Sequence, residues 1–483
     1  MSKARDLANF GDDISDGVIS AERIPVIPSG THEFVASGAL DTGDLVVVNA
    51  DGTVSVVSDT TTTLGSNTAF KSGTDIYATV IYDEGSQNYV IIYSDVEDGY
   101  YGKAVVATVS GTSVTFGSTV VFESANTGLI SATYDKNAGK IVITYRSSAN
   151  SYYGKAIVGT VSGTSISFGT PTLYTSTTVN WSQPVYDEAS QKIVLPYMDA
   201  VYGSCKAIVG TVSGTSISFG AAVNFPTTAY VNSIGAAYDK TSQRTVVAYG
   251  LQYEAFGAAT TITVSGTTPT IAAAQNFNTY TTQSVKAQYS EVDGCVYIAF
   301  RDGGSSNGGA IIQAKMAGTL LSFGAKYLPV VSDAIGMSFT ISPNDTGFTI
   351  VTVYSVTYGT ISNGVVNTMG STANFQAGSV GCAVNTTGDK YLIAYANGNS
   401  AVFEYALSNL NASNFVGFSK DVYQDGETAT VQIAGSVVNT QSGLEAGKKY
   451  YANSGNTLSP TPDSVGEAVA GTAISSTSLI VKG

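Results

Sequence analysis

Charge and the side chains of acid–base and metal chemistry are what this sequence has least of. Only 12% of its 483 residues are charged, about half of the roughly 25% that is usual for soluble domains. There is one histidine, His32, and one tryptophan, Trp181. Common zinc sites and Ser-His-Asp triads both use histidine, so we expect neither after residue 32. On this basis we predict no enzymatic activity, no bound metal and no cofactor.

Positive charge, long apolar runs and paired cysteines are also missing. A net charge of −14 argues against binding to nucleic acid or to anionic membrane surfaces, because both need clustered lysine and arginine. No apolar run is long enough to cross a bilayer, and the N-terminus lacks the apolar core of a secretory signal. The cysteines Cys205, Cys295 and Cys382 follow no motif spacing. We expect free, buried thiols in a chain that folds in a reducing cytoplasm.

Strand and turn residues, by contrast, are abundant and are organised in a repeat. Val, Ile, Thr and Tyr favour strands, while Gly, Ser, Asn and Asp favour turns. A Tyr-Asp pair begins at each of Tyr82, Tyr134, Tyr186 and Tyr238, and each copy follows the last by 52 residues. Three further copies place Tyr289, Ile341 and Val384 at the equivalent position.

Each full copy contains four strand-like runs, as the second copy illustrates. They span residues 130–134, 140–145, 155–161 and 165–174, and turns such as DKNAG and SGT separate them. Four strands per repeat of about 50 residues is typical of a β-propeller blade, whereas the rungs of the main rival, a β-solenoid, are much shorter. Seven copies therefore predict an all-β protein with a seven-bladed β-propeller. The sixth copy lacks the long loop in its middle.

The seventh copy ends after its third strand, at residues 401–407, and its missing fourth strand lies ahead of the first copy. TLGSNTAF (63–70) matches TFGSTVVF (115–122), the fourth strand of the first copy. We therefore expect an N-terminal strand to complete the last blade and to remove an open sheet edge. The chain would then enter and leave the propeller at one face.

Both flanks of the repeats are β-rich, so we expect the two chain ends to build one small β-domain into which the propeller is inserted. The predicted boundaries are residues 1–30 for an N-terminal leader, 31–62 and 409–483 for the two parts of the terminal β-domain, and 63–408 for the propeller.

The loops on the opposite face of the predicted propeller are long and differ from copy to copy. They join the second strand of a blade to its third, and each blade to the next, as in RSSANSYYGK and TSTTVNWSQP. Their composition resembles an antibody paratope, where tyrosine supplies rigid contact area and Ser, Gly and Asn supply hydrogen bonds. The candidate ligand-binding residues of this face are Tyr100, Tyr101, Arg146, Tyr152, Tyr153, Trp181, Tyr202, Tyr230, Tyr253, Tyr280, Arg301 and Asp302.

Other roles stay open for some of these loop residues. Tyr101 and Tyr153 precede Gly-Lys in register, and packing between blades suits them as well as ligand contact does. The carboxylates of residues 94–99, Asp199 and Asp302 are oxygen donors of the kind that calcium takes, although no EF-hand pattern occurs. Tyr93, Tyr145, Tyr197 and Tyr249, in contrast, close the second strand at the repeat spacing, and we expect them in the core.

Glycan hydrolysis is the main enzymatic alternative on a scaffold of this kind. A sialidase needs an arginine cluster and a S-x-D-x-G-x-T-W box. The box is missing here, and of the five arginines only Arg146 and Arg301 fall at nearly equivalent positions. Spacing alone does not decide against a glycosidase pair of carboxylates, so hydrolysis ranks as the third hypothesis.

Several stretches resemble proteins of phage particles. SKARDLANFGDDISDGVISAERIP resembles the leader segments of virion appendage proteins from marine tailed phages, and KAIVGTVSGTSISFG resembles the propeller repeats of such proteins. The flanks, including FVASGALDTGDLVVVNADGTVSVV, resemble a phage structural β-module. Together these stretches cover nearly the whole chain, and they imply a location in the virion.

The resemblance implies a tail fibre or tail appendage that assembles in the bacterial cytoplasm and contacts other virion proteins through its N-terminal segment and terminal β-domain. The far propeller face would bind the host surface, through a glycan or another envelope component. A homo-oligomer is implied, with a trimer favoured. The alternative is a capsid decoration or head-fibre protein without a specific receptor.

Overall fold

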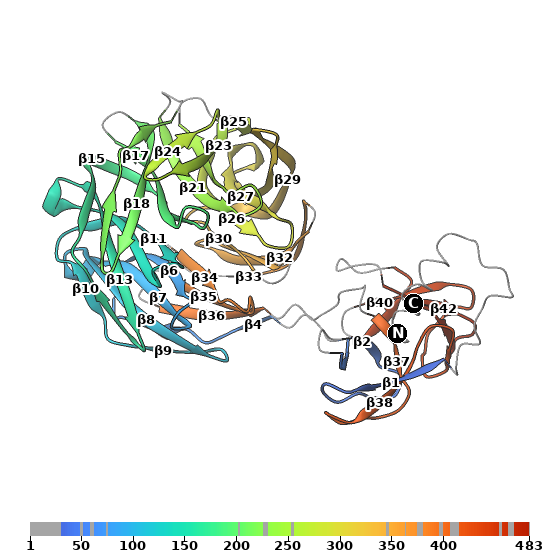
Figure 1. Cartoon of the computed structure of the whole chain (residues 1–483). Helices are drawn as coiled ribbons and strands as arrows, with labels where there is room; N and C mark the ends of the chain where they lie inside the picture. Colours follow the sequence, from blue (N-terminus) through green and yellow to red (C-terminus); the bar gives the residue numbers. More distant parts are fainter. Residues whose placement is uncertain are drawn as a thin grey trace. The chain divides into compact units, whose positions relative to one another are not determined.

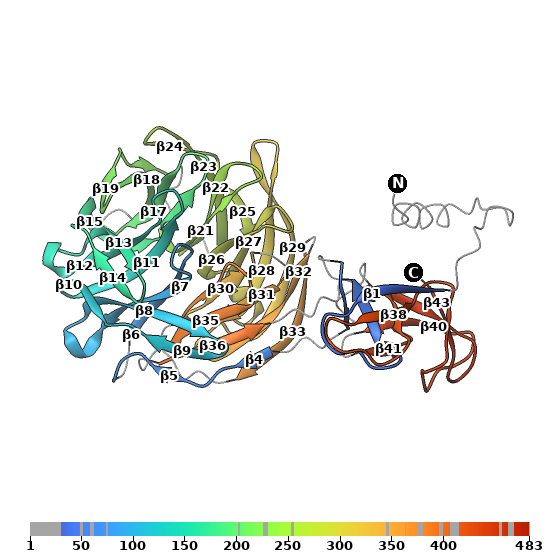
Figure 2. The same ribbon diagram turned by 60° about the horizontal axis from the view of Figure 1, so that its bottom comes forward.

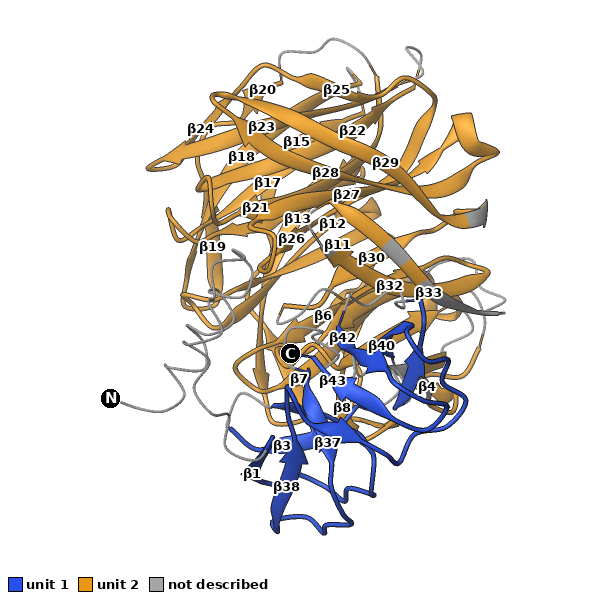
Figure 3. Cartoon of the chain, turned by 90° about the vertical axis from the view of Figure 1, so that its right-hand side faces the viewer, with its two compact units in different colours: residues 1–61, 406–483 blue, residues 62–405 orange. Residues whose placement is uncertain are grey.

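The chain forms two compact units, residues 1–61 with 406–483 and residues 62–405, which are coloured separately in Figure 3. The structure is a computed structural model that describes residues 30–48, 52–57, 62–73, 76–200, 203–225, 230–252, 256–343, 347–362, 364–373, 380–395, 399–405, 415–453, 456–461 and 468–482. The division falls within three residues of the predicted boundaries at 63 and 408. Of the predicted leader, residues 1–29 lie outside the described residues.

The predicted all-β class is confirmed. Across the described residues every regular element is a strand in an antiparallel sheet, apart from three single turns of 3₁₀ helix. These turns are η2 (Val96–Asp98), η3 (Ser148–Asn150) and η4 (Gly303–Ser305). No helix in this part of the chain is long and apolar enough to span a membrane.

The larger unit consists of seven antiparallel meanders, which we number in chain order; Figures 1 and 2 show them following one another through the unit. Meander 1 contains β6 (Ile76–Asp83), β7 (Asn88–Asp95), β8 (Tyr101–Ser110), β9 (Ser113–Phe116) and β10 (Val120–Glu123). Meander 2 contains β11 (Thr127–Asp135), β12 (Lys140–Ser147), β13 (Tyr153–Ser162), β14 (Ser165–Phe168) and β15 (Thr172–Ser182). Meander 3 contains β16 (Val185–Asp187), β17 (Lys192–Asp199), β18 (Ser204–Ser213), β19 (Ser216–Phe219) and β20 (Val223–Asn224).

The remaining meanders repeat this order. Meander 4 contains β21 (Val231–Asp239), β22 (Arg244–Leu251), β23 (Phe256–Ser265), β24 (Thr268–Ile271) and β25 (Gln275–Asn278). Meander 5 contains β26 (Thr282–Ser290), β27 (Cys295–Asp302), β28 (Gly308–Ala317) and β29 (Leu320–Asp333), and meander 6 contains β30 (Ser338–Ile341), β31 (Gly347–Val351), β32 (Ser355–Ser362) and β33 (Val365–Ala373). Meander 7 contains β34 (Val380–Val384), β35 (Lys390–Tyr395) and β36 (Asn399–Tyr405) with β4 (Thr62–Leu64) and β5 (Thr68–Ala69).

Two details of the strands differ from the sequence prediction. The expected fourth strand, residues 165–174, is broken after β14 at Gly169, where a Cβ atom would lie 1.8 Å from the carbonyl oxygen of Thr215. Beyond the break, β15 runs on for 11 residues and pairs with both β13 and β17, so meanders 2 and 3 form one ten-stranded sheet. Trp181 therefore lies in a strand, where a loop was expected, because residues 175–179 are rich in the β-branched Thr and Val.

The last meander uses a strand from the start of the repeat region. Thr62 pairs with Tyr405, and Ala69 pairs with Asn399 at the other end of β36. The chain thus enters and leaves the larger unit side by side, at the end of meander 7 opposite to the connection between β35 and β36. Residues 63–70 do complete the last meander, as the match to residues 115–122 predicted.

The core of the larger unit consists of apolar layers between successive meanders. The second strands supply tyrosines that the repeat spacing predicted to be buried, and this is confirmed for Tyr93, Tyr145, Tyr197 and Tyr249, which are at most 2% exposed. Each ring packs edge-on against an aromatic ring of the preceding meander, as Tyr145 does on Phe122. Cys205, Cys295 and Cys382 are free and buried, which agrees with the prediction for the cysteines.

The smaller unit contains two five-stranded antiparallel sheets, and each end of the chain contributes to it. One sheet comprises β1 (Thr31–Val35), β2 (Leu45–Val48), β3 (Val54–Val56), β37 (Phe415–Ser419) and β38 (Thr428–Gln432). The other comprises β39 (Val437–Val438), β40 (Lys449–Asn453), β41 (Thr457–Ser459), β42 (Val469–Ala473) and β43 (Leu479–Val481). Leu45 and Phe418 of the first sheet share a buried core with Tyr450 and Leu479 of the second.

Candidate functional site

The candidate site lies at the end of the meanders where the second strand leads into the third; we call it the loop end, and the opposite end the turn end. In meanders 1, 2 and 5 the loop-end connection is a single 3₁₀ turn. Asp95, Ser147 and Asp302 cap these turns by accepting a hydrogen bond from a backbone N–H two residues on. A short polar residue at the end of the second strand therefore sets the shape of each loop.

Two of the candidate tyrosines follow these turns with an unusual backbone. Tyr100 and Tyr152 have φ values of +64° and +60°, in the left-handed region that costs a side-chain-bearing residue roughly 1–2 kcal/mol. Their N–H groups donate to the carbonyls of Asp95 and Ser147 at 2.7 and 2.9 Å. The backbone thus holds two large aromatic side chains at positions that glycine would fill with less strain.

Backbone hydrogen bonds also link each loop to the segment that leads into the next meander. The carbonyl of Tyr100 accepts from Thr127 at 2.8 Å, and the carbonyl of Tyr152 accepts from Val179 at 3.2 Å. Further bonds of the same kind join Asn126 to Ser148, Thr178 to Ala200, Gly203 to Val231, Tyr230 to Gln252, Thr281 to Gly303 and Asn307 to Ala334. In the described segments, backbone hydrogen bonds thus connect neighbouring loops of the loop end and support their side chains.

Several candidate aromatics project from this support into solvent. Tyr100, Tyr152, Trp181 and Tyr280 are 38–53% exposed, although a large aromatic ring is ordinarily well buried. Tyr101 and Tyr153 are partly buried at the starts of β8 and β13. Tyr202 and Tyr253 lie outside the described residues.

Arg146 and Tyr230 belong to one contact network that links meander 2 to the segment leading into meander 4. The Arg146 guanidinium lies over the ring of Tyr152, 5.3 Å from its centroid, and donates to the side-chain oxygen of Asn180 at 3.1 Å. The amide of Asn180 in turn donates to the Tyr230 hydroxyl at 3.2 Å. Asn180 was not among the predicted site residues, although Asn232 occupies the equivalent position 52 residues on and Trp181 is its neighbour.

Arg301 occupies the place equivalent to Arg146 in meander 5, but it has a different partner. Its guanidinium donates to both carboxylate oxygens of Asp333, at 2.6 and 3.2 Å, and to the side chain of Gln283. Asp333 neutralises the charge of Arg301, whereas the partners of Arg146 in this structure are neutral. The two predicted arginines thus have separate sets of partners, Asn180 and Val179 for Arg146 and Asp333 and Gln283 for Arg301.

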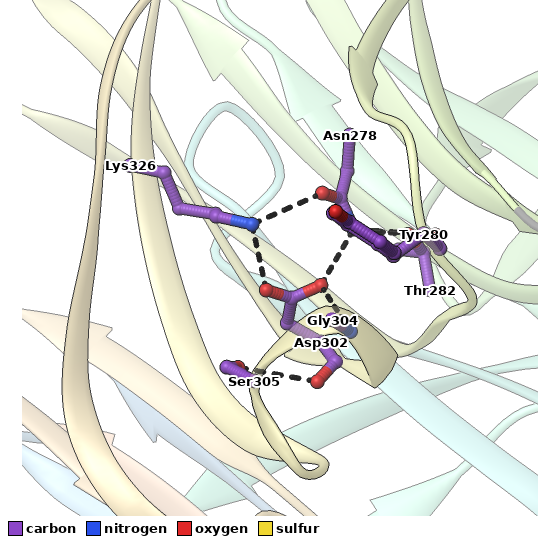
Figure 4. Close-up of polar contacts among 7 residues, drawn as sticks. All are labelled: Asn278, Tyr280, Thr282, Asp302, Gly304, Ser305 and Lys326. Atoms are coloured by element: carbon purple, nitrogen blue, oxygen red, sulfur yellow. Dashed lines mark hydrogen bonds and ion pairs between the residues drawn. The ribbon is translucent and has the colours of Figure 1, made fainter.

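Asp302 is a supporting residue of the loop end, since its side chain is fully buried. Figure 4 shows its carboxylate between Lys326, which donates at 2.7 Å, and Asn278, which donates at 2.9 Å. Burial alone would raise the pKa of Asp302, but these hydrogen bonds outweigh it and lower the pKa. Lys326 also lies 5.5 Å from the centre of the exposed Tyr280 ring, so the buried ion pair positions that aromatic.

Asp95 and Asp199, two other loop carboxylates that suggested calcium, are paired with lysine as well. Asp95 accepts from Lys71 at 2.6 Å and from Lys103 at 2.9 Å, and Asp199 accepts from Lys206 at 2.8 Å. These ammonium groups supply the positive charge that a calcium ion would otherwise bring. In the part of the chain that the structure describes, no group of three His, Cys, Asp or Glu residues is placed to hold a metal ion.

One exposed aromatic of the loop end was missed from the sequence. Tyr354 is 51% exposed in the tight turn between β31 and β32, where the N–H of Thr352 donates to the carbonyl of Ser355 at 2.8 Å. The turn agrees with the predicted absence of a long loop in the sixth copy. The tyrosine was overlooked because the short connection was not treated as part of the variable face.

A cavity of about 850 Å³ runs along the first strands of the meanders. Its wall includes residues of all seven of these strands, β6, β11, β16, β21, β26, β30 and β34. Trp181 lines it near the loop end. At the turn end, Lys136 pairs with Glu84 at 3.3 Å and with Glu188 at 3.5 Å, and Lys240 pairs with Glu188 at 3.4 Å and with Glu291.

Comparison with known proteins adds no family to these observations, since neither a protein-family model nor a curated protein matches the chain.

Proposed function

We infer that the seven meanders are the blades of a closed seven-bladed β-propeller. The first support is an aromatic contact that recurs at successive boundaries. Phe122 packs on Tyr145 with ring centres 5.2 Å apart, and Phe70, which follows β5 of meander 7, packs in the same way on Tyr93 of meander 1 at 5.3 Å. The boundary between the last and first meanders thus repeats an internal one.

Two other contacts support the same closure. A Cβ atom on Gly117 would lie 1.8 Å from the carbonyl oxygen of Thr164, and one on Gly169 would lie 1.8 Å from that of Thr215. Gly65 of meander 7 makes the same kind of contact with meander 1, where its Cβ atom would lie 2.4 Å from the carbonyl oxygen of Thr112. At the turn end, Tyr134 accepts from the N–H of Gly85 in the preceding meander. The equivalent Tyr82 bonds to Thr386 of meander 7.

On this scaffold, we propose that the chain is a binding protein whose loop end recognises a glycan of a bacterial surface. The observation that carries the proposal is the set of exposed aromatics, Tyr100, Tyr152, Trp181, Tyr280 and Tyr354, on rigid backbone among small polar residues. Aromatic rings held in this way contact a ligand at a low cost in conformational entropy. Their faces suit sugar rings, while neighbouring amides and hydroxyls suit sugar hydroxyls.

The resemblance to phage virion proteins suggests where this binding protein works. We propose a tail fibre or tail appendage, with the smaller unit and the N-terminal segment attached to other virion proteins. The larger unit has a suitable polarity, because Thr62 and Tyr405 lie at the turn end of meander 7. The ligand-binding side chains are at the other end of the meanders, away from the point of attachment.

Binding of the full-length chain to an array of bacterial lipopolysaccharides and capsular polysaccharides tests the glycan proposal. We expect binding to at least one glycan and a loss of roughly tenfold or more for Tyr152→Ala and Tyr280→Ala. Leu173→Ala is the matched control, because Leu173 is an exposed apolar residue on β15, 44% exposed, where that strand pairs with Lys155 of β13. Equal binding by all three variants, or no binding to any glycan, would overturn the proposal.

Antibody labelling of purified particles of the encoding phage tests the location. Label on the tail supports the appendage. Label on the capsid would replace it with the decoration or head-fibre alternative, and unlabelled particles would contradict a virion protein altogether. Release of reducing sugar from a bound polysaccharide would instead favour the hydrolase.

A further inference from the structure

The cavity along the first strands contains one charged side chain away from its turn-end mouth. Lys286 of β26 lines the cavity. In the region that the structure describes, no ion pair or hydrogen bond involves its ammonium group, whereas Lys136 and Lys240 are both paired with glutamates. Protein atoms surround the Lys286 side chain, but water can enter the cavity that it lines. Its accessible surface is therefore only half-buried. The ammonium group therefore has no protein acceptor among the described residues.

The repeat shows how exceptional this lysine is. The residues at the same repeat position in the other six meanders are small or uncharged: Thr79, Ser131, Gln183, Gly235, Ser338 and Gly381. The position is crowded, because a Cβ atom on Gly235 would come within 2.7 Å of the Lys286 backbone, and one on Gly381 within 2.8 Å of Thr79. A lysine at a position that otherwise takes short side chains places a long cationic group in the cavity wall.

Burial lowers the pKa of Lys286 from its ordinary value, because desolvation disfavours a charged ammonium group. The charged ammonium group therefore destabilises the fold. An anion that enters the cavity and accepts its hydrogen bonds would reduce this destabilisation. Away from the turn end, where Glu84, Glu188 and Glu291 are paired with lysines, the lining includes hydroxyls and amides. Ser131, Gln183 and Ser338 are examples, and such groups suit a polyhydroxylated molecule. Trp181 lines the same cavity and supplies an aromatic face.

From this arrangement we propose that the cavity is a binding site for a negatively charged sugar, whose anionic group is held by Lys286 and whose ring lies near Trp181. The choice of a sugar rests on the proposed glycan-binding function, and the cavity extends that function from the loop end into the interior. A volume of about 850 Å³ falls in the range of ordinary ligand sites, roughly 300–1,000 Å³. The negative charge comes from a carboxylate or from a phosphate.

Intrinsic fluorescence offers a direct readout, because Trp181 is the one tryptophan of the chain. The full-length protein is titrated with D-glucuronate, glucose 6-phosphate and D-glucose at constant ionic strength. We expect a saturable change in Trp181 fluorescence with one or both anionic sugars and none with glucose. The two anionic sugars distinguish a carboxylate ligand from a phosphate ligand. A response to glucose equal to that of the anions, or no response to any of the three, would overturn the proposal.

Lys286→Met and Lys286→Gln test the role of the lysine, and Lys315→Met is the matched control because Lys315 is exposed on β28 of the same meander. We expect both Lys286 variants to bind roughly ten- to hundredfold more weakly, the loss of one charge-assisted hydrogen bond, and the control to bind as the wild type does. Undiminished binding by the Lys286 variants would overturn the proposal.

Thermal unfolding supplies a second measurement that guards against misfolded variants. Removing an unpaired, desolvated charge is expected to leave Lys286→Met at least as stable as the wild type, while anionic sugar raises the Tm of the wild type alone. If the Tm of Lys286→Met is well below that of the wild type, the Lys286 ammonium group does make a stabilising contact, which contradicts the proposal. If Lys286→Met and the wild type bind the glycan array equally well, the cavity proposal is wrong, while the loop-end proposal keeps its support.

Discussion

The loop end and the turn end of the meanders are made from the same strands, yet they use tyrosine in opposite ways. At the turn end Tyr134 and Tyr238 bond to the backbone of the preceding meander at 3.1 Å. At the loop end Tyr152 and Tyr280 leave large parts of their rings in solvent. The turn end is repetitive and hydrogen-bonded within the protein, whereas the loop end is irregular and exposed. The turn-end tyrosines therefore join the meanders, and the loop-end tyrosines are available to bind a ligand.

Carboxylates differ between the two ends in the same manner. At the loop end the lysine partners of Asp95 and Asp302 outweigh burial and lower the pKa of both groups. At the turn end Asp135 and Asp187 accept backbone hydrogen bonds in their own turns, but burial dominates and raises the pKa of each. These two pairs of carboxylates should therefore respond to acid with opposite signs. The turn-end Asp389 is an exception, because burial would raise its pKa but hydrogen bonds from Thr387 and Asn385 outweigh burial and lower it.

The largest expected effect comes from breaking the buried ion pair at the loop end. Asp302→Asn leaves the Lys326 ammonium without its counter-charge, and we expect the free energy of unfolding to fall by about 3–4 kcal/mol. Chemical unfolding of the larger unit measures this. The control is Asp333→Asn, since Asp333 is 38% exposed beside Arg301, and its loss is expected to stay below about 1 kcal/mol. Equal losses in both variants would contradict the supporting role of Asp302.

A steric contact between meanders comes next. Gly169→Ala would place a Cβ atom 1.8 Å from the carbonyl oxygen of Thr215, so the backbone must shift, and we expect a loss of about 2–3 kcal/mol. Gly163→Ala is the matched control, because its φ is +57° but no atom lies within 4 Å of the new Cβ; there we expect about 1 kcal/mol. If Gly169→Ala is the milder variant in thermal unfolding, the contact with Thr215 is not as close as described.

Acid titration tests the comparison of carboxylates directly. The folded pKa of Asp302 is lowered, so its stabilisation is complete above the unfolded pKa of about 3.9 and is lost as the pH falls through the folded value. The folded pKa of Asp187 is raised, so its charged form costs stability at neutral pH, and that cost disappears as the pH falls from the folded value toward about 3.9.

Differences in unfolding free energy between pH 7 and about pH 3 separate the two cases. The advantage of the wild type over Asp302→Asn should shrink on acidification, and its advantage over Asp187→Asn should grow. If both differences from the wild type change in the same direction on acidification, the proposed contrast between Asp302 and Asp187 is wrong.

A smaller effect is expected from the tyrosine bonds of the turn end. Tyr238→Phe leaves the N–H of Ala189 without its acceptor, and we expect a loss of about 1 kcal/mol in unfolding free energy. The same change at Tyr152, whose hydroxyl makes no hydrogen bond within the described residues, should have no measurable effect on stability. A larger loss for Tyr152→Phe than for Tyr238→Phe would reverse the assignment of the two ends.

Repeat spacing was enough to predict the framework. The interval of 52 residues located the tyrosines of the second strands, the turn-end hydrogen-bonding tyrosines and the closing strand before the first meander, because each depends on one copy following another. It did not locate Asn180 or Lys286. Lys286 occupies a repeat position whose counterparts are other residue types. Asn180, whose counterpart 52 residues on is Asn232, owes its role to its contacts with Arg146 and Tyr230.

Loop geometry was also beyond the sequence pattern. Composition pointed to tyrosines on one face, but it did not distinguish Tyr280, which stays exposed, from Asp302, which burial and Lys326 make a supporting residue. Trp181 was expected in a loop and lies in β15, because pairing with both β13 and β17 extends that strand. Such outcomes depend on partners far along the chain, which local propensity does not contain.

The smallest expected effect concerns the backbone that presents Tyr152. Its φ of +60° disfavours any side chain, so Tyr152→Gly should be more stable than Tyr152→Ala by about 0.5–1 kcal/mol. Both variants lose the ring, and both should lose glycan binding equally. Thermal unfolding and array binding together separate the two properties. If Tyr152→Ala proves as stable as Tyr152→Gly, residue 152 does not keep its left-handed backbone in solution. Holding the Tyr152 ring at this position would then carry no conformational cost.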